Sequence, residues 1–327
     1  MPINPASDAL EPDPSGRPGA VKESHLGQAA ESVNRHIEAI NRRAGRNLFA
    51  SLGVAVGLIA VVAAGLWWWK WGFVLLVGLA LLGGVRELAQ ALRAQLGARP
   101  TLPPLLVGGL ALLIGVYSAS GGWSGWSQTA LLRSWSWGEV LLGGLTLTAL
   151  ACLVWRLPGG VEGYVRDVAA SLFILAYLPL LGSSIMVLLA APDGPRRIAL
   201  FIVAVVGCDT GAYVTGVLLG RHKMAPRISP GKTWEGLIGG LIWAAAFGLA
   251  MAWLCQSDWW RTLLVAVAVA VSAVLGDLIE SAVKRDLGLK DLGHLLPGHG
   301  GIMDRIDSYV VAAPVAWLTM TLLLPGS

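Results

Sequence analysis

Residues 281–308 read SAVKRDLGLKDLGHLLPGHGGIMDRIDS and separate two long apolar runs. The charged residues of this stretch are Lys284, Arg285, Asp286, Lys290, Asp291, Asp304, Arg305 and Asp307. Just upstream, Asp277 and Glu280 fall inside the preceding apolar run. An ionisable side chain at membrane depth costs roughly 3 kcal/mol to insert, so it marks a functional candidate. The stretch therefore indicates a membrane protein with a site at the membrane edge.

The composition supports this interpretation. The chain has 327 residues, of which 55% are hydrophobic and 13% are charged, whereas soluble domains carry about 25% charged residues. The net charge of +4 is explained by Lys and Arg near the membrane, and we expect no nucleic-acid partner. The three cysteines, Cys152, Cys208 and Cys255, lie apart in apolar runs. This spacing predicts neither a disulfide framework nor a cysteine metal site.

Hydropathy predicts an all-α polytopic membrane protein, because about 20 consecutive apolar residues suffice for one spanning helix. We expect nine spans, at 47–69, 72–92, 102–120, 138–156, 168–190, 197–219, 234–255, 260–282 and 306–324. The polar residues 1–46 predict a partly disordered tail with a short surface helix. We divide the chain into this tail, N-terminal membrane helices at 47–195 and a C-terminal catalytic region at 196–327.

The basic residues predict the orientation. Lys and Arg gather in the loops between spans two and three, four and five, six and seven, and eight and nine. These loops share one side with the basic tail, which the positive-inside rule places in the cytoplasm. Arg196 and Arg197 are exceptions. We expect a cytoplasmic N-terminus and a C-terminus on the opposite side.

The acids of the last two spans are candidate metal ligands. On a helix, Asp277, Ser281 and Lys284 share a face with Glu280, and Asp304 and Asp307 lie one turn apart. The loop between these spans could bring Asp304 opposite Asp277. Carboxylates from two helices suit Mg²⁺, which completes its shell with waters and substrate phosphates. The alternative is that these acids form structural ion pairs with the nearby Lys and Arg residues.

Two further motifs suggest anion binding. The glycines of Pro297–Gly301 let backbone N–H groups approach an anion, and His299 could orient a phosphate. A second block begins at Asp209, whose face on span six would continue through Tyr213, Gly216 and Gly220 and line a cavity or pack on another helix. Ser229-Pro230 is typical of a helix start, which would place Lys232 and Thr233 near an anion at that terminus.

The two blocks resemble the phosphatidate cytidylyltransferase (CDP-diacylglycerol synthase) family. The first matching pattern runs from Gly276-Asp277 through Lys284-Arg285, Lys290-Asp291 and Pro297–Gly301 to Asp304-Arg305 and Asp307-Ser308. The second runs from Asp209-Thr210 through His222-Lys223 to Lys232–Gly236. The chain departs from the family pattern at Cys208, where Asn is common, and at Gly231, where a second Lys is common. The match covers about the C-terminal third.

The resemblance implies transfer of CMP from CTP to phosphatidic acid, giving CDP-diacylglycerol and pyrophosphate, with Mg²⁺ as cofactor. Asp277 and Asp304 match the metal-binding acids. The implied catalytic residues are Asp277, Asp304, Lys284, Arg285 and Lys290. The implied substrate-binding residues are Asp209, Tyr213, His222, Lys223, Ser229, Lys232, Thr233, Glu280, Ser281, Asp291, His299, Gly300, Gly301, Arg305 and Asp307. We expect a bacterial inner membrane location with a cytoplasm-facing site and surrounding membrane lipids as partners, and a homodimer is left open.

Two other classes of protein compete with the enzyme. An ion- or proton-coupled transporter would also carry acids at membrane depth, such as Asp209, Asp277 and Glu280. A transporter needs a path to both sides, but the ionisable residues gather at one end of the spans, which favours the enzyme. A non-catalytic scaffold would leave the acids unexplained.

Overall fold

The computed structural model describes residues 66, 70–122, 135–293 and 301–324, and all structural statements concern these residues. Eight of their helices are long and apolar enough to cross a membrane. Each corresponds to one of the last eight predicted spans, with ends that differ by a few residues, so the prediction of an all-α polytopic membrane protein is confirmed. The predicted tail, 1–46, and the predicted first span, 47–69, lie outside the described residues apart from Leu66.

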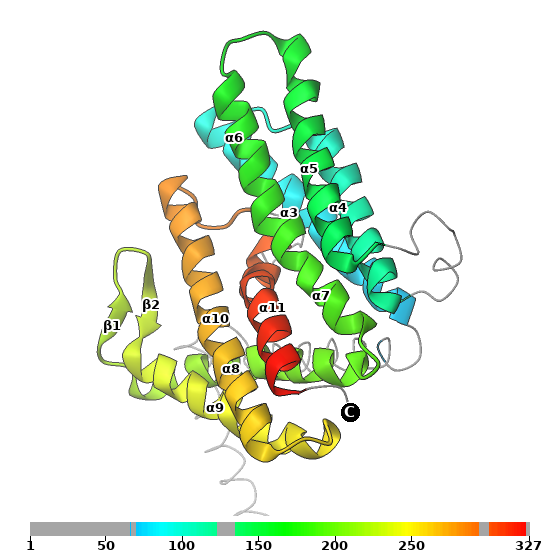
Figure 1. Cartoon of the computed structure of the whole chain (residues 1–327). Helices are drawn as coiled ribbons and strands as arrows, with labels where there is room; N and C mark the ends of the chain where they lie inside the picture. Colours follow the sequence, from blue (N-terminus) through cyan, green and yellow to red (C-terminus); the bar gives the residue numbers. More distant parts are fainter. Residues whose placement is uncertain (1–65, 67–69, 123–134, 294–300, 325–327) are drawn as a thin grey trace, which may run out of the picture. The chain divides into compact units, whose positions relative to one another are not determined.

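The first four spanning helices come from residues 70–190 (Figure 1). They are α3 (Lys70–Leu96), α4 (Leu102–Tyr117) with the π-helical η1 (Ser118–Gly122), α5 (Trp137–Arg156) with the 3₁₀ turn η2 (Leu157–Gly159), and α6 (Tyr164–Leu175), joined by the π-helical η3 (Ala176–Leu180) to α7 (Leu181–Ala190). The π-helical segment η3 contains Pro179, whose missing N–H cannot continue the regular ladder.

The last four spanning helices carry most of the predicted site residues. They are α8 (Gly194–Leu219), α9 (Trp234–Leu254), α10 (Trp259–Asp286) and α11 (Met303–Leu323). Helix α8 packs mainly on α9, and α10 packs mainly on α11, which lies beside it in Figure 1. Small residues allow these close approaches, because a side chain at Gly240 would press on the Cys208 carbonyl oxygen and one at Gly276 on that of Asp307.

A short antiparallel hairpin precedes α9. Its strands are β1 (Lys223–Ala225) and β2 (Ser229–Thr233). The expectation that Ser229-Pro230 starts a helix is wrong, since these residues begin β2. Helix α9 starts at Trp234 instead, where Thr233 is the N-cap and its Oγ1 accepts a hydrogen bond from Gly236 N at 3.1 Å. The hairpin therefore ends directly at the N-terminus of α9.

A buried carboxylate ties the connections among α3 to α6 together. Asp167 is 0% exposed and accepts hydrogen bonds from Arg99 N at 2.8 Å and from Arg156 Nε at 2.7 Å. Arg156 also donates to the carbonyl oxygens of Gly160 and Glu162. The pair is fully hydrogen-bonded, as a buried charge requires. A structural ion pair therefore accounts for Arg156.

Candidate active site

A cavity of about 510 Å³ opens between α8, the hairpin, α9 and α10. Its lining residues are Asp209, Ala212, Tyr213, Gly216, Val217, Met224, Ser229, Gly231, Lys232, Thr233, Gly236, Leu237, Val274 and Asp277. Six of these are predicted site residues, namely Asp209, Tyr213, Ser229, Lys232, Thr233 and Asp277. The two sequence blocks therefore meet in one cavity, and the Asp209 face of α8 lines it as far as Gly216.

An ion pair forms part of the lining of this cavity. Lys232 Nζ on β2 lies 2.8 Å from Asp277 Oδ2 on α10, and the side chains are 22% and 36% exposed. Ser281, one turn further along α10, donates from its hydroxyl to Asp277 Oδ1 at 3.2 Å. Both charges remain accessible from the cavity, so they could turn towards a ligand.

Further negative charge gathers behind this pair. Asp209 on α8 and Asp307 on α11 interact electrostatically with Asp277 and with each other. Like charges in a medium of low dielectric repel one another unless a cation or a proton intervenes. No group of three or more His, Cys, Asp or Glu in the described ranges is arranged to hold a metal ion. A cation here would thus take only one or two carboxylates and complete its shell from a ligand, as Mg²⁺ does.

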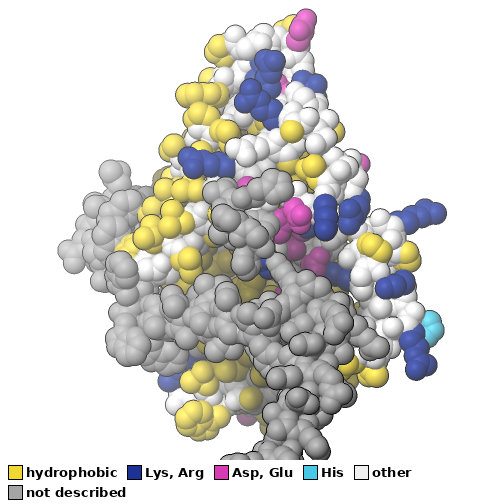
Figure 2. All heavy atoms as spheres, turned by 180° about the vertical axis from the view of Figure 1, so that it is seen from behind, with side chains coloured by type: hydrophobic (Ala, Val, Ile, Leu, Met, Phe, Trp, Pro, Cys, Tyr) yellow, Lys and Arg dark blue, Asp and Glu magenta, His cyan; other side chains and the backbone are white. Residues whose placement is uncertain are grey.

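A second polar cluster joins α10 to α11. Lys284 forms an ion pair with Glu280, one turn before it, and lies 2.9 Å from Asp304 Oδ1. Asp304 Oδ2 accepts a hydrogen bond from Gly301 N at 2.9 Å. Glu280 is 0% exposed, so Lys284 is the cationic partner of a carboxyl group that has left water entirely. Figure 2 shows Asp and Glu side chains gathered beside Lys and Arg side chains on one face.

The relation between Asp277 and Asp304 differs from the expectation. Helices α10 and α11 are antiparallel, and a side chain at Gly276 would meet the backbone of Asp307 and Ser308. Asp304 lies one helical turn earlier on α11 and contacts Lys284 instead. Asp307 is therefore the acid opposite Asp277. Asp304 lies opposite Lys284, two turns further along α10.

The hairpin is held by contacts outside the cavity. His222 Nδ1 lies 2.6 Å from Glu235 Oε1, and the His222 side chain is 79% exposed. Arg285 Nε donates to the Ile228 carbonyl oxygen at 3.2 Å. Neither side chain lines the cavity. These two predicted site residues therefore fix the hairpin in place.

The remaining predicted site residues are placed as follows. Lys223, Lys290, Asp291 and Arg305 are exposed and do not line the cavity, and Gly301 is buried beside Asp304. His299 and Gly300 lie outside the described residues.

The two departures from the family pattern have different surroundings. Cys208 is 0% exposed, and its thiol lies 3.8 Å from the Ala270 carbonyl oxygen in the packing of α8 on α10. Gly231 lines the cavity, and a Cβ added there would meet no atom within 4 Å. The Cys208 side chain therefore points away from the cavity, and Gly231 leaves room in it.

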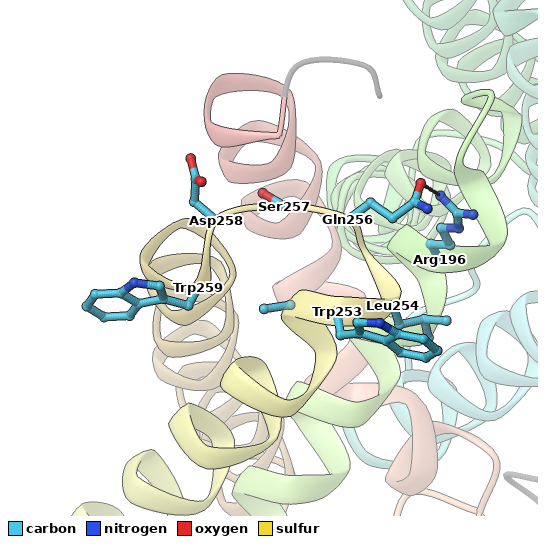
Figure 3. A pocket seen from close by; sticks show the side chains of 8 residues that line it. Arg196, Trp253, Leu254, Gln256, Ser257, Asp258 and Trp259 are labelled. Carbon is cyan, nitrogen blue, oxygen red and sulfur yellow. Dashed lines mark hydrogen bonds between the residues drawn. The ribbon is translucent and has the colours of Figure 1, made fainter.

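A larger cavity of about 620 Å³ lies at the turn between α9 and α10 (Figure 3). It is lined by Arg196, Ala252, Trp253, Leu254, Gln256, Ser257, Asp258 and Trp259. In this lining, Arg196 Nη1 donates a hydrogen bond to Gln256 Oε1 at 2.8 Å. None of the predicted site residues lines it, so size alone does not identify the site.

The sequence interpretation missed Glu87. Glu87 lies within the second predicted span, is 1% exposed, and accepts a hydrogen bond at its Oε2 from Met303 N at 2.8 Å. An acid within an apolar run is a signal that could have identified it.

Comparison with known proteins gives a consistent result. The model of the Cytidylyltransferase family matches residues 50–323. A phosphatidate cytidylyltransferase of Mycobacterium leprae is 36% identical over 299 residues, covering 86% of this chain and 90% of that protein. One of Mycobacterium bovis is 34% identical over 311 residues, covering 90% and 95%. One of Staphylococcus haemolyticus is 42% identical over 152 residues, covering 46% and 57%. Since the family model and the mycobacterial relatives both extend over most of its length, the chain belongs to the cytidylyltransferase family.

Proposed function

We propose that this membrane enzyme transfers CMP from CTP to phosphatidic acid, giving CDP-diacylglycerol and pyrophosphate. The family and the names of the relatives support this function, and nothing in them supports the transporter. The observation that carries the proposal is the cavity in which Lys232 from one block meets Asp277 from the other. A cation and a carboxylate beside one cavity suit a polyphosphate and its counterion.

The cavity offers an anion site for the CTP triphosphate. The cavity is lined by Thr233, the N-cap of α9, and by Gly236 in its first turn, and a helix N-terminus carries partial positive charge. Lys232 adds a full positive charge on the adjacent strand. We assign the phosphates of CTP to Lys232 and this helix end, with Tyr213 and Ser229 as further lining contacts.

The reaction needs alignment more than covalent chemistry. A phosphate oxygen of phosphatidic acid attacks the α-phosphorus of CTP, the bond from that phosphorus to the bridging oxygen breaks, and pyrophosphate leaves with the electron pair. Holding the two reactants in line and neutralising the developing charge supply most of the catalysis. The acyl chains would remain among the membrane lipids beside the apolar outer faces of the helices.

We assign Mg²⁺ to this site as the cofactor. The fit rests on the donors present, because Asp277 opens on the cavity and the charges of Asp209 and Asp307 act on it. Asp277 would hold the ion at the cavity, the expected second ligand Asp304 would join it only by leaving Lys284, and bound Mg²⁺ would neutralise charge on the phosphates. Lys232 and Lys284 now neutralise these two carboxylates. We infer that the lysines turn towards phosphate when the carboxylates take the metal.

We place the site at the cytoplasmic face of a bacterial inner membrane, within residues 196–327. The basic loops that flank the spans support this side. Of the exposed predicted residues, Arg285, Lys290 and Arg305 would attract the anionic reactants from the surface, as basic groups beside a membrane do. Assembly as a homodimer stays a prediction.

The test is product formation by the purified chain in lipid nanodiscs. With radiolabelled CTP, phosphatidic acid and Mg²⁺, we expect a labelled lipid and release of pyrophosphate. Without phosphatidic acid, no labelled lipid should form. A chain that yields no lipid product but carries protons or ions across liposomes would support the transporter instead.

A further inference from the structure

A carboxylate from the N-terminal half of the chain reaches the start of the last helix. Glu87 Oε2 accepts a hydrogen bond from Met303 N at 2.8 Å, across 216 positions in sequence. Met303 is the first residue of α11, and the N-cap residue Ile302 makes no side-chain hydrogen bond. Because the first N–H groups of a helix have no partner within it, Glu87 supplies a cap that the local sequence lacks.

The Glu87 carboxyl group also lies close to Gly293 and Gly301, two glycines that precede Asp304 in the sequence. A methyl group at Gly293 would collide with the Glu87 carboxyl group, and one at Gly301 would lie 2.6 Å from Glu87 Oε2 and 3.0 Å from Asp304 Oδ2. Gly301 N donates to Asp304 Oδ2 at 2.9 Å. Gly301 thus lies between the two carboxylates, and only a residue without a side chain fits there.

Packing alone does not account for Glu87. The residue is 1% exposed, and its Oε1 has no hydrogen-bond partner among the described residues. Burying a carboxylate with one oxygen unsatisfied is costly, and an apolar side chain would fill the same space without that cost. The other oxygen holds the first turn of α11, a contact that an apolar side chain would not provide.

We propose that Glu87 is a positioning residue for Asp304. By capping α11 and closing on Gly301, it fixes where Asp304 faces Lys284, so the N-terminal helices set the geometry of a site whose other parts come from the C-terminal region. This inference rests on the proposed function. A misplacement of about 1 Å can lower turnover by about 100-fold, so a residue that never touches the reactants can still control the rate.

The test compares Glu87→Ala with Glu87→Gln and with a matched control. Leu88→Ala shortens the neighbouring buried side chain of α3, which is 0% exposed in the hydrophobic core. For Glu87→Ala we expect kcat to fall about 10-fold to 100-fold while KM for CTP stays within about 3-fold. Glu87→Gln keeps an acceptor for Met303 N, so it should recover most of kcat. Leu88→Ala should lower Tm without changing kcat.

Two further measurements do not depend on enzyme turnover. Hydrogen exchange of the peptide that begins α11 should speed up about 10-fold in Glu87→Ala but not in Leu88→Ala. The thermal shift that CTP and Mg²⁺ produce should need a higher Mg²⁺ concentration in Glu87→Ala alone. If the wild-type protein shows slow exchange at the start of α11 but forms no lipid product, the proposed function is contradicted. This outcome differs from a failure of the positioning role.

Gly301→Ala disturbs the position of Glu87 by a change in the loop. It replaces Glu87→Ala in the test if that variant does not fold. Its methyl group separates the two carboxylates, so we expect the loss of kcat and the faster exchange to recur. The proposal is overturned if Glu87→Ala or Gly301→Ala keeps the wild-type kcat and exchange. It is also overturned if Leu88→Ala lowers kcat as much as Glu87→Ala does.

Discussion

Lys232 and Asp277, 45 positions apart in sequence, form an ion pair of 2.8 Å that joins the β1–β2 hairpin to α10 across the candidate active site. Both residues line the cavity, so the pair puts one positive and one negative group within reach of the same ligand. Its exposure of 22% and 36% means that its own contribution to stability is small, about 0–1 kcal/mol. We therefore expect the pair to affect ligand binding more than stability.

Replacing Lys232 should weaken CTP binding. In Lys232→Met the side chain keeps its length but loses the charge that faces the cavity, so we expect KM for CTP to rise at least about 10-fold, as when a charge-assisted contact is lost. Arg227→Ala, an exposed change in the turn of the same hairpin, is the control and should leave KM unchanged. Equal KM values for Lys232→Met and wild type, measured by initial rates, would remove Lys232 from the site.

Adding a lysine at position 231 should strengthen CTP binding. Gly231 lines the cavity with open space around its Cα, so Gly231→Lys can place a second ammonium group there without a steric clash. We expect KM for CTP to fall about 3-fold to 10-fold, with greater sensitivity to ionic strength. Gly231→Ala is the matched control for backbone effects. If Gly231→Lys and Gly231→Ala give the same KM, the cavity does not hold the phosphates.

Removing Lys284 should destabilise the protein strongly. Glu280 is 0% exposed and depends on Lys284, which also compensates Asp304. Losing the cation of such a buried cluster costs up to about 3–5 kcal/mol, because Glu280 must then stay buried as an unpaired charge or take up a proton. We expect Lys284→Ala to lower Tm far more than Arg261→Ala, which breaks a more exposed pair with Asp258. Thermal unfolding in nanodiscs measures both, and similar small shifts would mean that Glu280 finds another partner.

The membrane helices could be predicted from the sequence because hydropathy is a property of each segment by itself. Apolar runs of about 20 residues leave a spanning helix as the only way to satisfy the backbone in lipid. The eight spanning helices among the described residues each lie within a few residues of a predicted span, and the polar end of α10, predicted at 282, lies at Asp286. The predicted first span awaits a test, since it lies outside the described residues.

The sequence predicted individual site residues better than it predicted which of them face one another. Residues on one helix, such as Asp277 and Ser281, share a face by geometry alone, and the structure joins them by a hydrogen bond. Which residue of α11 faces Asp277 depends on the offset of the two helices along their axes. Gly276 sets this offset, because the absence of a side chain there lets the Asp307 backbone approach. The β strands were missed because segments of 3 and 5 residues carry little pattern. Glu87 was missed because its partner is 216 positions away.

The most direct test compares turnover of Asp277→Asn with that of Asp258→Asn. Both changes remove one carboxylate from α10 or its N-terminal boundary, but Asp277 lines the candidate active site and Asp258 lines the larger cavity in Figure 3. With CTP, phosphatidic acid and Mg²⁺, we predict that Asp277→Asn loses at least about 100-fold in kcat, the effect of removing a key electrostatic group, while Asp258→Asn keeps wild-type kcat. Full turnover by folded Asp277→Asn would contradict the account.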